Sequence, residues 1–520
     1  MEFWMKLFVL EAAILNFAVQ GWHFTHMLQL NSYRPERYKK WCRDNEKKLV
    51  TLSRVLPALC VFCILLEMKL PQDKKWITFA VCGGILLLTA LLNWPKKAKK
   101  PLVVTARVKR VFLTEAVLCG VLCAMFWFLP VRGAALLGLA HVVIWLFVGI
   151  ANRINTPIEN KIAQGFVKDA QRRLAERPDL TVVGITGSYG KTSVKNFLSA
   201  LLAVKYNVLM TPGSYNTTMG VVRTVREMLR PSHQVFIAEM GAKQKNDIQE
   251  ICDLVHPTYG ILTSVGEQHL ETFGSVENII ATKFELVDSI PAEGMAFLNY
   301  DNDYIRNRAV SVPNLTYGDA DSGAAYRYSD IAVDTHGCQF TLTAPDGESC
   351  RYTTRLLGAH NIQNLAGCMA LAHHLGISLQ EMVYPIRLLK PVEHRLQLLP
   401  NGYIDDAYNS NPAGFRSALD TLSGFAAQRI LVTPGMVELG ERQDALNREL
   451  GEYAATCCDW AVLVGEKQAP PLKEGLLAGG FPEERIFVAA TLKEGLNFVN
   501  NLPREGERIV LLENDLPDNF

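Results

Sequence analysis

One segment constrains the fold of this chain more than any other: a run of β-branched residues leads into glycines and then into a helical pattern. Thr181–Thr186 is predicted to form a buried strand, Gly187–Gly190 a tight loop, and Lys191–Leu202 an amphipathic helix. A strand, a glycine loop and a helix in this order form one unit of a parallel α/β sheet. The backbone N–H groups at such a helix start point toward a bound anion.

The loop also carries side chains suited to a nucleotide. Lys191 supplies a charge for the β- and γ-phosphates, and Thr192 a hydroxyl for Mg²⁺. The strict phosphate-loop pattern fails because Ile185 stands where its first glycine belongs, so a purely structural glycine turn is the alternative. The flanking strand and helix favour a nucleotide site. The residues expected around the phosphates are Gly187, Ser188, Gly190, Lys191, Thr192 and Ser193.

Two later strands each end at a polar residue. Val235–Ala238 leads to Glu239, and Tyr259–Val265 leads to a segment containing His269. Ligands of parallel sheets bind at the carboxyl ends of strands, so Glu239 and His269 are candidates for a metal site beside the phosphates. Taken singly, a Glu or His at a strand end is more often a surface or capping group.

Lys283 lies on the apolar side of a predicted helix. In Ser275–Ile290 the apolar positions Ile279 and Val287 are four residues before and after it, so the spacing places the lysine on the inward face. Lysines are seldom buried unless they are paired or functional. The alternative is a lysine that extends from the edge of the apolar stripe to water.

The first 150 residues differ in composition from the rest. They hold 20 basic and 8 acidic residues, a net charge of +12, whereas the remaining 370 carry −11. Apolar runs in this region predict four to five transmembrane helices. Basic residues concentrate in two loops between the runs, which places those loops in the cytoplasm and predicts that the catalytic domains are cytoplasmic as well. The loops are Asn31–Ser53 and Pro95–Arg110, and the apolar runs are Leu7–Val19, Val55–Leu66, Trp76–Trp94, Val111–Leu129 and Ala134–Ile150.

Composition excludes several classes of protein. The acidic bulk argues against a nucleic-acid binder, and a chain of 520 residues is too long for a small stapled scaffold. The cysteines show no zinc-like spacing with histidine, which indicates a reduced protein without disulfides. Glu11 and Glu115 lie within apolar runs, where they could form a polar site or pair with a neighbouring helix.

Over about residues 180–465 the chain resembles the Mur ligase family, and within it the branch that adds a D-alanyl-D-alanine dipeptide. The motifs occur in family order. They read Gly184-Ile-Thr-Gly-Ser-Tyr-Gly-Lys-Thr-Ser193, Asn216-Thr-Thr-Met-Gly220, Ala238-Glu-Met-Gly-Ala242, His269-Leu-Glu-Thr-Phe-Gly-Ser275, Ala281-Thr-Lys-Phe-Glu285, Leu298-Asn-Tyr-Asp-Asn-Asp303, Gly358-Ala-His-Asn361 with Asn364, Arg395-Leu-Gln397, Ile404-Asp-Asp-Ala-Tyr-Asn-Ser-Asn-Pro412 and Gly435-Met-Val-Glu-Leu-Gly440.

The resemblance implies an ADP-forming amide ligase that uses ATP and Mg²⁺ and passes through an acyl phosphate. It implies metal contacts from Thr192, Glu239, His269 and Lys283, and it implies that Lys283 is modified to a carbamate. The catalytic residues it implies are Lys191, Lys283, His269 and Arg395. The remaining nucleotide contacts implied are Asn299, Asp303, Asn361, Asp406 and Asn409, and Asn411 shares the C-terminal motif.

We therefore expect a membrane-anchored α/β protein in four parts. They are transmembrane helices (1–150), an amphipathic connector (151–180), a central ATP-binding domain (181–398) and a C-terminal Rossmann-like domain (399–520). Three features depart from the family pattern. The nucleotide-gripping N-terminal domain has no counterpart, Thr217 replaces an asparagine, and Leu512–Asp518 stands where a Lys-Gly-Ser-Arg motif is expected.

The predicted function is peptide-bond formation in cell-envelope precursor synthesis. An amino acid or dipeptide would join a peptide-carboxylate acceptor, which the missing domain suggests is lipid-linked at the membrane. Alternatives are a poly-γ-glutamate-type synthase and a non-catalytic ATP-binding scaffold. A transport ATPase is a third, for which we find no coupling signature.

Overall fold

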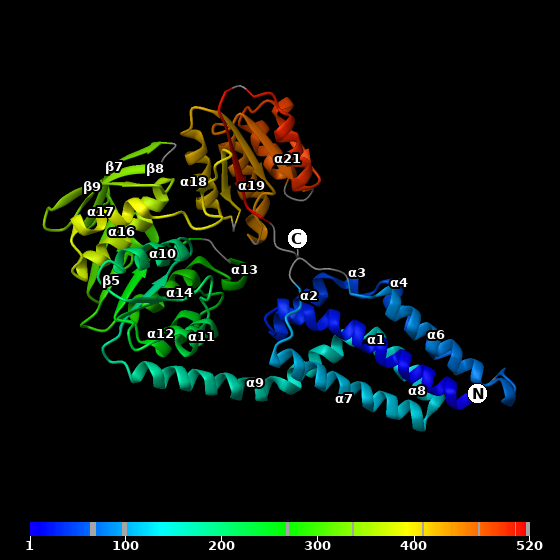
Figure 1. Ribbon diagram of the computed structural model, residues 1–520. Coiled ribbons are helices and arrows are strands. Elements are labelled where there is room, and N and C mark those ends of the chain that lie inside the picture. Colours follow the sequence, from blue (N-terminus) through cyan, green and yellow to red (C-terminus); the bar gives the residue numbers. More distant parts are fainter. Residues whose placement is uncertain are drawn as a thin grey trace. The chain divides into compact units, whose positions relative to one another are not determined.

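The computed structural model divides into two compact units, Met1–Gly165 and Phe166–Phe520 (Figure 1). It describes residues 1–62, 69–95, 101–266, 270–334, 337–407, 410–437, 439–465, 469–504 and 506–515. His269, Asn409 and the end of the segment Leu512–Asp518 therefore lie outside the described residues, as does part of the apolar run Val55–Leu66.

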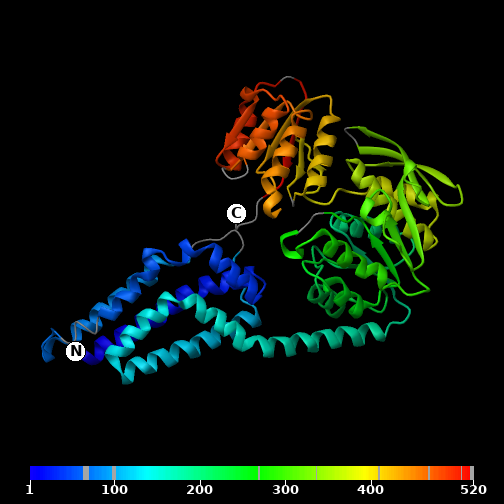
Figure 2. The ribbon, with the colours of Figure 1, turned by 180° about the vertical axis from the view of Figure 1, so that it is seen from behind.

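The first unit is helical. In Figures 1 and 2 its long helices run side by side, with α1 in contact with α6, α7 and α8. The helices are α1 (Glu2–Leu30), α2 (Pro35–Asp44), α3 (Glu46–Leu49), α4 (Leu52–Val55), α6 (Trp76–Leu92), α7 (Ala106–Phe128), α8 (Pro130–Val142) and α9 (Ile144–Ala175), with 3₁₀ turns at Leu56–Phe62 and Gln72–Lys74.

The prediction of a multi-pass membrane protein is wrong. Among the described residues only α7 is by itself long and apolar enough to cross a bilayer, with α8 and α9 as a second candidate if that bent pair is counted as one span. The predicted run Trp76–Trp94 forms a helix of 17 residues, about 26 Å long and short of the 30 Å hydrocarbon core. The predicted run Ala134–Ile150 is interrupted between α8 and α9, which meet at 80°.

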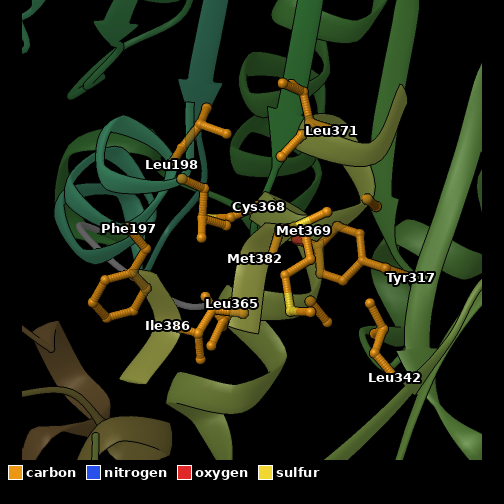
Figure 3. Packing of buried hydrophobic residues seen from close by; sticks show 14 of the residues in the cluster. Phe197, Leu198, Tyr317, Leu342, Leu365, Cys368, Met369, Leu371, Met382 and Ile386 are labelled. Atoms are coloured by element: carbon orange, nitrogen blue, oxygen red, sulfur yellow. The ribbon is translucent and has the colours of Figure 1, made fainter. Parts of the chain in front are cut away.

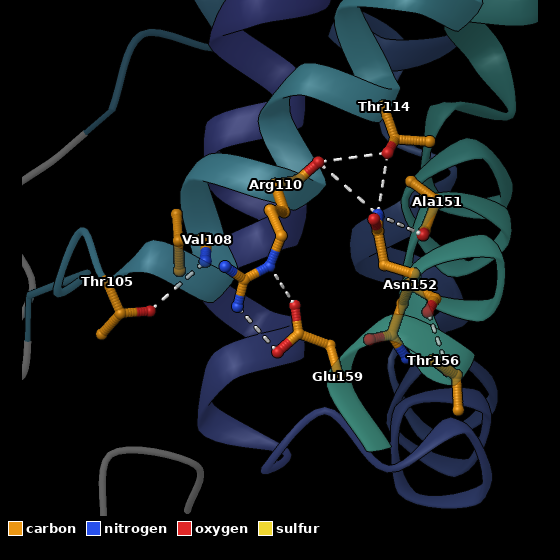
Figure 4. A network of polar contacts seen from close by, with 9 residues as sticks. Thr105, Val108, Arg110, Thr114, Ala151, Asn152, Thr156 and Glu159 are labelled. Carbon is orange, nitrogen blue, oxygen red and sulfur yellow. Dashed lines mark hydrogen bonds and ion pairs between the residues drawn. The ribbon is translucent and has the colours of Figure 1, made fainter. Parts of the chain in front are cut away.

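Polar contacts inside the first unit also depart from that prediction. Figure 4 shows Arg110 of α7 donating two hydrogen bonds to Glu159 of α9, Nε to Oε1 at 2.5 Å and Nη2 to Oε2 at 2.9 Å. One turn away Asn155 donates to Thr114 Oγ1 at 2.8 Å. Asn16 and Gln20 of α1 are buried. The helices of this unit thus pack through polar as well as apolar side chains.

The second unit begins with a nine-stranded sheet in the order β2-β3-β1-β4-β5-β6-β7-β8-β9. Strands β1 to β7 pair in parallel, and β8 and β9 extend the sheet antiparallel. Its strands are β1 (Thr181–Thr186), β2 (Val208–Met210), β3 (Val235–Glu239), β4 (Tyr259–Leu262), β5 (Met295–Asn299), β6 (Asn314–Asp319), β7 (Tyr326–Asp334), β8 (Gly337–Thr343) and β9 (Ser349–Thr354).

Helices cover both faces of this sheet. One face packs against α10 (Lys191–Leu202), α16 (Ala359–His374) and α17 (Leu379–Leu388), and Figure 3 shows Cys368 of α16 in the cluster between Phe197 and Tyr317. The other packs against α11 (Thr218–Met228), α12 (Asp247–Val255) and α14 (Val276–Asp288). The short helices are α13 (Leu270–Phe273) and α15 (Asp303–Arg306), with a 3₁₀ turn at Ala320–Ser322. Burial on both faces accounts for the continuous apolar runs of the central strands.

The C-terminal part holds a six-stranded sheet in the order β10-β11-β15-β12-β13-β14. Its strands are β10 (Gln397–Leu398), β11 (Tyr403–Asp406), β12 (Gln428–Thr433), β13 (Trp460–Val464), β14 (Ile486–Ala489) and β15 (Arg508–Glu513). They alternate with α18 (Pro412–Ser423), α19 (Gln443–Ala454), α20 (Ala469–Ala478) and α21 (Leu492–Asn501), with 3₁₀ turns at Gly440–Arg442 and Glu483–Arg485. This alternation is the Rossmann-like pattern expected from the sequence.

Candidate active site

The glycine loop joins β1 to α10, as the sequence predicts. Gly190 caps the helix with φ +81°, in the left-handed region that favours glycine. A Cβ at Gly190 would lie 2.5 Å from Asn364 Oδ1, and one at Gly187 would lie 2.0 Å from Thr263 Oγ1. Because Asn364 and Thr263 come this close to the loop backbone, a side chain does not fit at either position, and both require glycine.

The loop is tied to the end of β4. Ser188 N donates to Ser264 O at 2.8 Å, Tyr189 N donates to Ser264 Oγ at 2.9 Å, and Gly266 N donates to Ser188 Oγ at 3.0 Å. Lys191 lies back across the loop, and its Nζ donates to Gly187 O at 2.6 Å and Ser188 O at 3.1 Å. The loop is thus preorganised around an ammonium group.

Glu239, at the end of β3, lies beside the start of α10. Thr192 Oγ1 donates to Glu239 Oε1 at 3.1 Å, and Asn216 Nδ2 donates to the same oxygen at 3.2 Å. The carboxylate is 1% exposed. A threonine hydroxyl and a carboxylate beside a phosphate loop are oxygen ligands of the kind that Mg²⁺ prefers, so these residues fit that ion. No cluster of three or more His, Cys, Asp or Glu side chains suited to a metal occurs among the described residues.

Lys195 is a site residue that the sequence reasoning missed. It is 1% exposed, and its Nζ lies 2.9 Å from Glu239 Oε2 and donates to Gly213 O at 2.5 Å. A signal was present in the sequence: Lys195 lies between the apolar positions Val194 and Phe197 of α10, four residues after Lys191. This signal is weaker than the one for Lys283, because Lys191 and Ser199 stand four residues before and after Lys195 where Lys283 has apolar residues.

Lys283 is buried on α14, at 3% exposure. Burial, followed by the charge of Lys191, lowers the pKa of the Lys283 amine well below its usual value. Burial also lowers the pKa of Lys191 to about 8, opposed by the Glu239 carboxylate and assisted by Arg395. The Lys191 and Lys283 charges therefore repel each other, and an anion close to both would relieve that repulsion.

Two of the implied nucleotide contacts, Asn299 and Asp303, take different positions. Asn299 is buried at the end of β5, where Nδ2 donates to Thr263 O at 2.7 Å and Oδ1 accepts from Asp301 N at 3.0 Å. Asp303 opens α15 with a side chain that is 73% exposed and pairs with Arg306. Asn299 therefore connects two strand ends, while Asp303 faces solvent.

Asn361 and Arg395 come from segments beyond the sheet. Asn361, in the first turn of α16, is buried and donates to Leu357 O at 2.8 Å. Arg395 precedes β10, and its charge acts on Lys191, His360 and Asp406. Arg395 is thus close enough to the phosphate loop and to the end of β11 for its charge to act on both. His360 Nδ1 and Ser417 Oγ, 2.6 Å apart, form a further contact between those two parts.

Asp406 ends β11 and faces Glu513 at the end of β15, which it pairs with in parallel register. Leu396 N donates to Asp406 Oδ1 at 3.0 Å. Glu513 is a second residue that the sequence reasoning missed. It lies inside Leu512–Asp518, the segment that departs from the family pattern. No periodicity in the sequence indicates that it pairs with Asp406, because the two strands are about a hundred residues apart.

Comparison with known proteins gives the same two domains. The Mur ligase middle domain matches residues 185–372, and the Mur ligase glutamate ligase domain matches residues 394–512. UDP-N-acetylmuramoyl-tripeptide--D-alanyl-D-alanine ligase from Haemophilus influenzae is 32% identical over 57% of this chain and 65% of its own length. The enzyme of the same name from Escherichia coli is 31% identical over 60% of this chain and 72% of its own length.

Solved structures agree. MurF from Acinetobacter baumannii has a TM-score of 0.61 at 27% identity, covering 67% of this chain and 76% of that one. MurF ligase from Thermotoga maritima, in complex with ADP, has a TM-score of 0.61 at 25% identity, covering 68% and 80%. The predicted resemblance is therefore confirmed, and the chain belongs to the Mur ligase family.

Proposed function

We propose that this chain joins the amino group of D-alanyl-D-alanine to the carboxylate of a muramoyl-tripeptide acceptor, with ATP converted to ADP and phosphate. The names of the curated relatives support this substrate pair. The single observation that carries it is the charge arrangement at the phosphate loop: Lys191, Lys195 and Lys283 with Glu239, all in reach of one end of the sheet.

The steps follow from those residues. Lys191 and the loop N–H groups stabilise negative charge on the phosphoryl group as it passes to the acceptor carboxylate. Thr192 and Glu239 would hold Mg²⁺, which neutralises phosphate oxygens when it is bound. Lys195 keeps the Glu239 carboxylate oriented in the absence of the ion. The resulting acyl phosphate is attacked by the amine, and Arg395 compensates charge on the departing phosphate.

Lys283 is proposed to act as a carbamate. The reaction of its amine with CO₂ requires the uncharged form, which burial favours. The product is an anion, and it would lie beside Lys191. Lys283→Ala should abolish turnover, and bicarbonate should raise the activity of CO₂-depleted wild-type protein but not of the variant. Unchanged activity of Lys283→Ala would remove this role.

The assay for the whole proposal uses the purified full chain with ATP, Mg²⁺, acceptor and dipeptide. ADP and phosphate should appear together only when both acceptor and dipeptide are present. Equal ADP release without them would refute the ligase function. Polymer formed from glutamate alone would instead support a poly-γ-glutamate-type synthase, and ATP binding without turnover a scaffold.

Roles for His269, Asn409, Asn299, Asp303 and Asn361 remain part of this proposal. The domain boundaries 181–398 and 399–520 belong to it as well. The names of the relatives specify a UDP-linked acceptor, and they give no support to the lipid-linked acceptor expected from the sequence. Parallel assays with the tripeptide on each carrier, followed by mass identification of the product, decide between the two.

A further inference from the structure

A buried lysine holds one side of the carboxylate that faces the phosphate loop. Lys195 and Glu239 are each 1% exposed, and Lys195 Nζ lies 2.9 Å from Glu239 Oε2. The same Nζ donates a hydrogen bond to Gly213 O at 2.5 Å. The ammonium group therefore lies between the end of β3 and the segment that follows β2, and α10 supplies its side chain. Three elements of the fold thus fix its position.

The two oxygens of the Glu239 carboxylate have different surroundings. Oε1 accepts hydrogen bonds from Thr192 Oγ1 at 3.1 Å and from Asn216 Nδ2 at 3.2 Å, so it lies on the side of the phosphate loop. Oε2 is buried and accepts no hydrogen bond from any described residue, and the charge of Lys195 lies beside it. A buried carboxylate oxygen is costly without a cation. Lys195 therefore stabilises Oε2 and leaves Oε1 to a ligand that Thr192 can share.

The segment that follows β2 keeps the Gly213 carbonyl in place. Glu239 N donates to Thr211 Oγ1 at 3.2 Å, and Gly241 N donates to Asn216 O at 2.7 Å. These bonds tie the segment to the end of β3 on both sides of Gly213. The carbonyl oxygen that holds the lysine ammonium group is thus fixed relative to the carboxylate, and the ammonium group cannot leave Oε2 without losing both partners.

The number of carboxylate oxygens that face a metal separates two common divalent cations. Mg²⁺ demands near-octahedral geometry at about 2.0–2.1 Å, whereas Ca²⁺ takes more oxygen ligands at about 2.3–2.6 Å and often both oxygens of one carboxylate. An ammonium group on one oxygen blocks binding through both. Residues that orient a metal ligand in this way act on the affinity of the metal without touching it.

We propose that Lys195 determines the metal specificity of this site. By holding Glu239 Oε2 it restricts the carboxylate to one oxygen toward the ion, which favours Mg²⁺ over Ca²⁺. The inference rests on the proposed function, in which Thr192 and Glu239 hold Mg²⁺, and it makes Lys195 a positioning residue that acts through Glu239. A lysine that only balanced a buried charge would support the two ions alike.

The test measures binding by the full chain without acceptor or amine, so it does not depend on turnover. Isothermal titration calorimetry gives the Kd of ADP in excess Mg²⁺ and in excess Ca²⁺. The wild-type chain should bind ADP more tightly with Mg²⁺. Lys195→Met frees Oε2, so the ratio of the Kd with Ca²⁺ to the Kd with Mg²⁺ should fall about tenfold, at the lower end of the 10–100-fold effects of residues that orient metal ligands.

Two further variants separate specificity from stability. Lys195→Arg keeps a cation beside Oε2 and should retain most of the wild-type preference for Mg²⁺. Lys205→Met is the matched control, because Lys205 is an exposed lysine just after α10 that also donates to a backbone carbonyl, Gly376 O at 3.0 Å. It should leave the ratio unchanged. If Lys195→Met does not fold, Lys195→Gln replaces it, since a neutral amide can still donate to Gly213 O but carries no charge to hold Oε2.

The ratio of the two Kd values decides the inference. If Lys195→Met or Lys195→Gln weakens ADP binding equally with both metals, the inference is overturned, because Lys195 then only stabilises the fold. A fall of the same size in Lys205→Met would overturn it as well. If the wild-type chain binds ADP as tightly with EDTA as with Mg²⁺, the Mg²⁺ role in the proposed function itself is refuted.

Discussion

The two sheets of the second unit present opposite charges at the same kind of edge. At the strand ends of the nine-stranded sheet Lys195 pairs with Glu239, and the charge of Lys191 acts on both Glu239 and Lys283. At the strand ends of the six-stranded sheet two carboxyls, Asp406 and Glu513, face each other. Both edges follow from parallel strands that alternate with helices.

This contrast shows that a common fold does not determine the ligand. A cationic edge with loop N–H groups suits the phosphates of ATP, whereas an edge with two buried carboxyl groups does not attract phosphate. The side chains at the strand ends, and not the shared fold, therefore set which charge each edge can hold. Each prediction below removes one charge or one contact from this arrangement.

The largest effect is expected at Lys191. Lys191→Met removes the ammonium group that stabilises charge on the transferring phosphoryl group, and activity should fall by about 10²–10³-fold or more. Hydroxylamine, an uncharged nucleophile at pH 7, traps an acyl phosphate as a hydroxamate. Hydroxamate formation should fall in parallel with amide formation, because the loss precedes the amine step. Lys493→Met, on the exposed face of α21, is the matched control. Retained hydroxamate formation would break the assignment of the cationic edge to ATP.

Lys195 tests whether the buried ion pair is structural. Lys195→Met leaves the Glu239 carboxylate buried without its cation, which costs about 3–5 kcal/mol of the free energy of unfolding. Denaturant unfolding measures this loss. Adding Glu239→Gln to Lys195→Met should recover a large part of the stability, since no charge is then left unpaired. If the double variant is no more stable than Lys195→Met, the pair does not couple.

Much of this fold was predictable from the sequence, because local patterns specify its elements. The segment Thr181–Leu202 predicted a strand, loop and helix that the structure contains, and the C-terminal alternation of strands and helices was predicted as well. The apolar content of the first 150 residues led to the wrong prediction of a multi-pass membrane protein. It does not distinguish a bilayer span from a helix packed in a bundle, and Asn16 and Gln20 turn inward on α1.

The site was predictable where a residue belongs to a motif. Lys191, Thr192 and Glu239 lie together as expected, and Lys283 is buried as its helical position predicts. Glu513 could not be found in this way, because its partner Asp406 meets it only through pairing of strands far apart in sequence. Tertiary pairs of this kind leave no periodic signal.

The acidic edge predicts a pH-dependent stability. Burial raises the pKa of Asp406 to about 6, above the 3.9 of an unfolded chain. The stability from its neutral form is therefore fully present below about pH 4 and lost as the pH rises through 6. Asp406→Asn should then stabilise the protein more at pH 7.5 than at pH 4, by about 1–2 kcal/mol, measured by denaturant unfolding at both pH values. An equal effect at the two pH values would show that Asp406 is not perturbed by its surroundings.

The smallest effect is expected where the two edges are joined. The Ser417 hydroxyl lies 2.6 Å from His360 Nδ1, and burial and Arg395 lower the pKa of His360 to about 4, so the imidazole is neutral. Ser417→Ala should cost about 1 kcal/mol of stability, the value of one neutral hydrogen bond. Because the contact joins the part with the phosphate loop to the C-terminal part, and the proposed amine step needs both parts together, the KM for the dipeptide should rise a few-fold while hydroxamate formation stays unchanged. Ser423→Ala, at the exposed end of the same helix, is the control. If the KM for ATP rises instead, the Ser417–His360 contact acts only on the cationic edge.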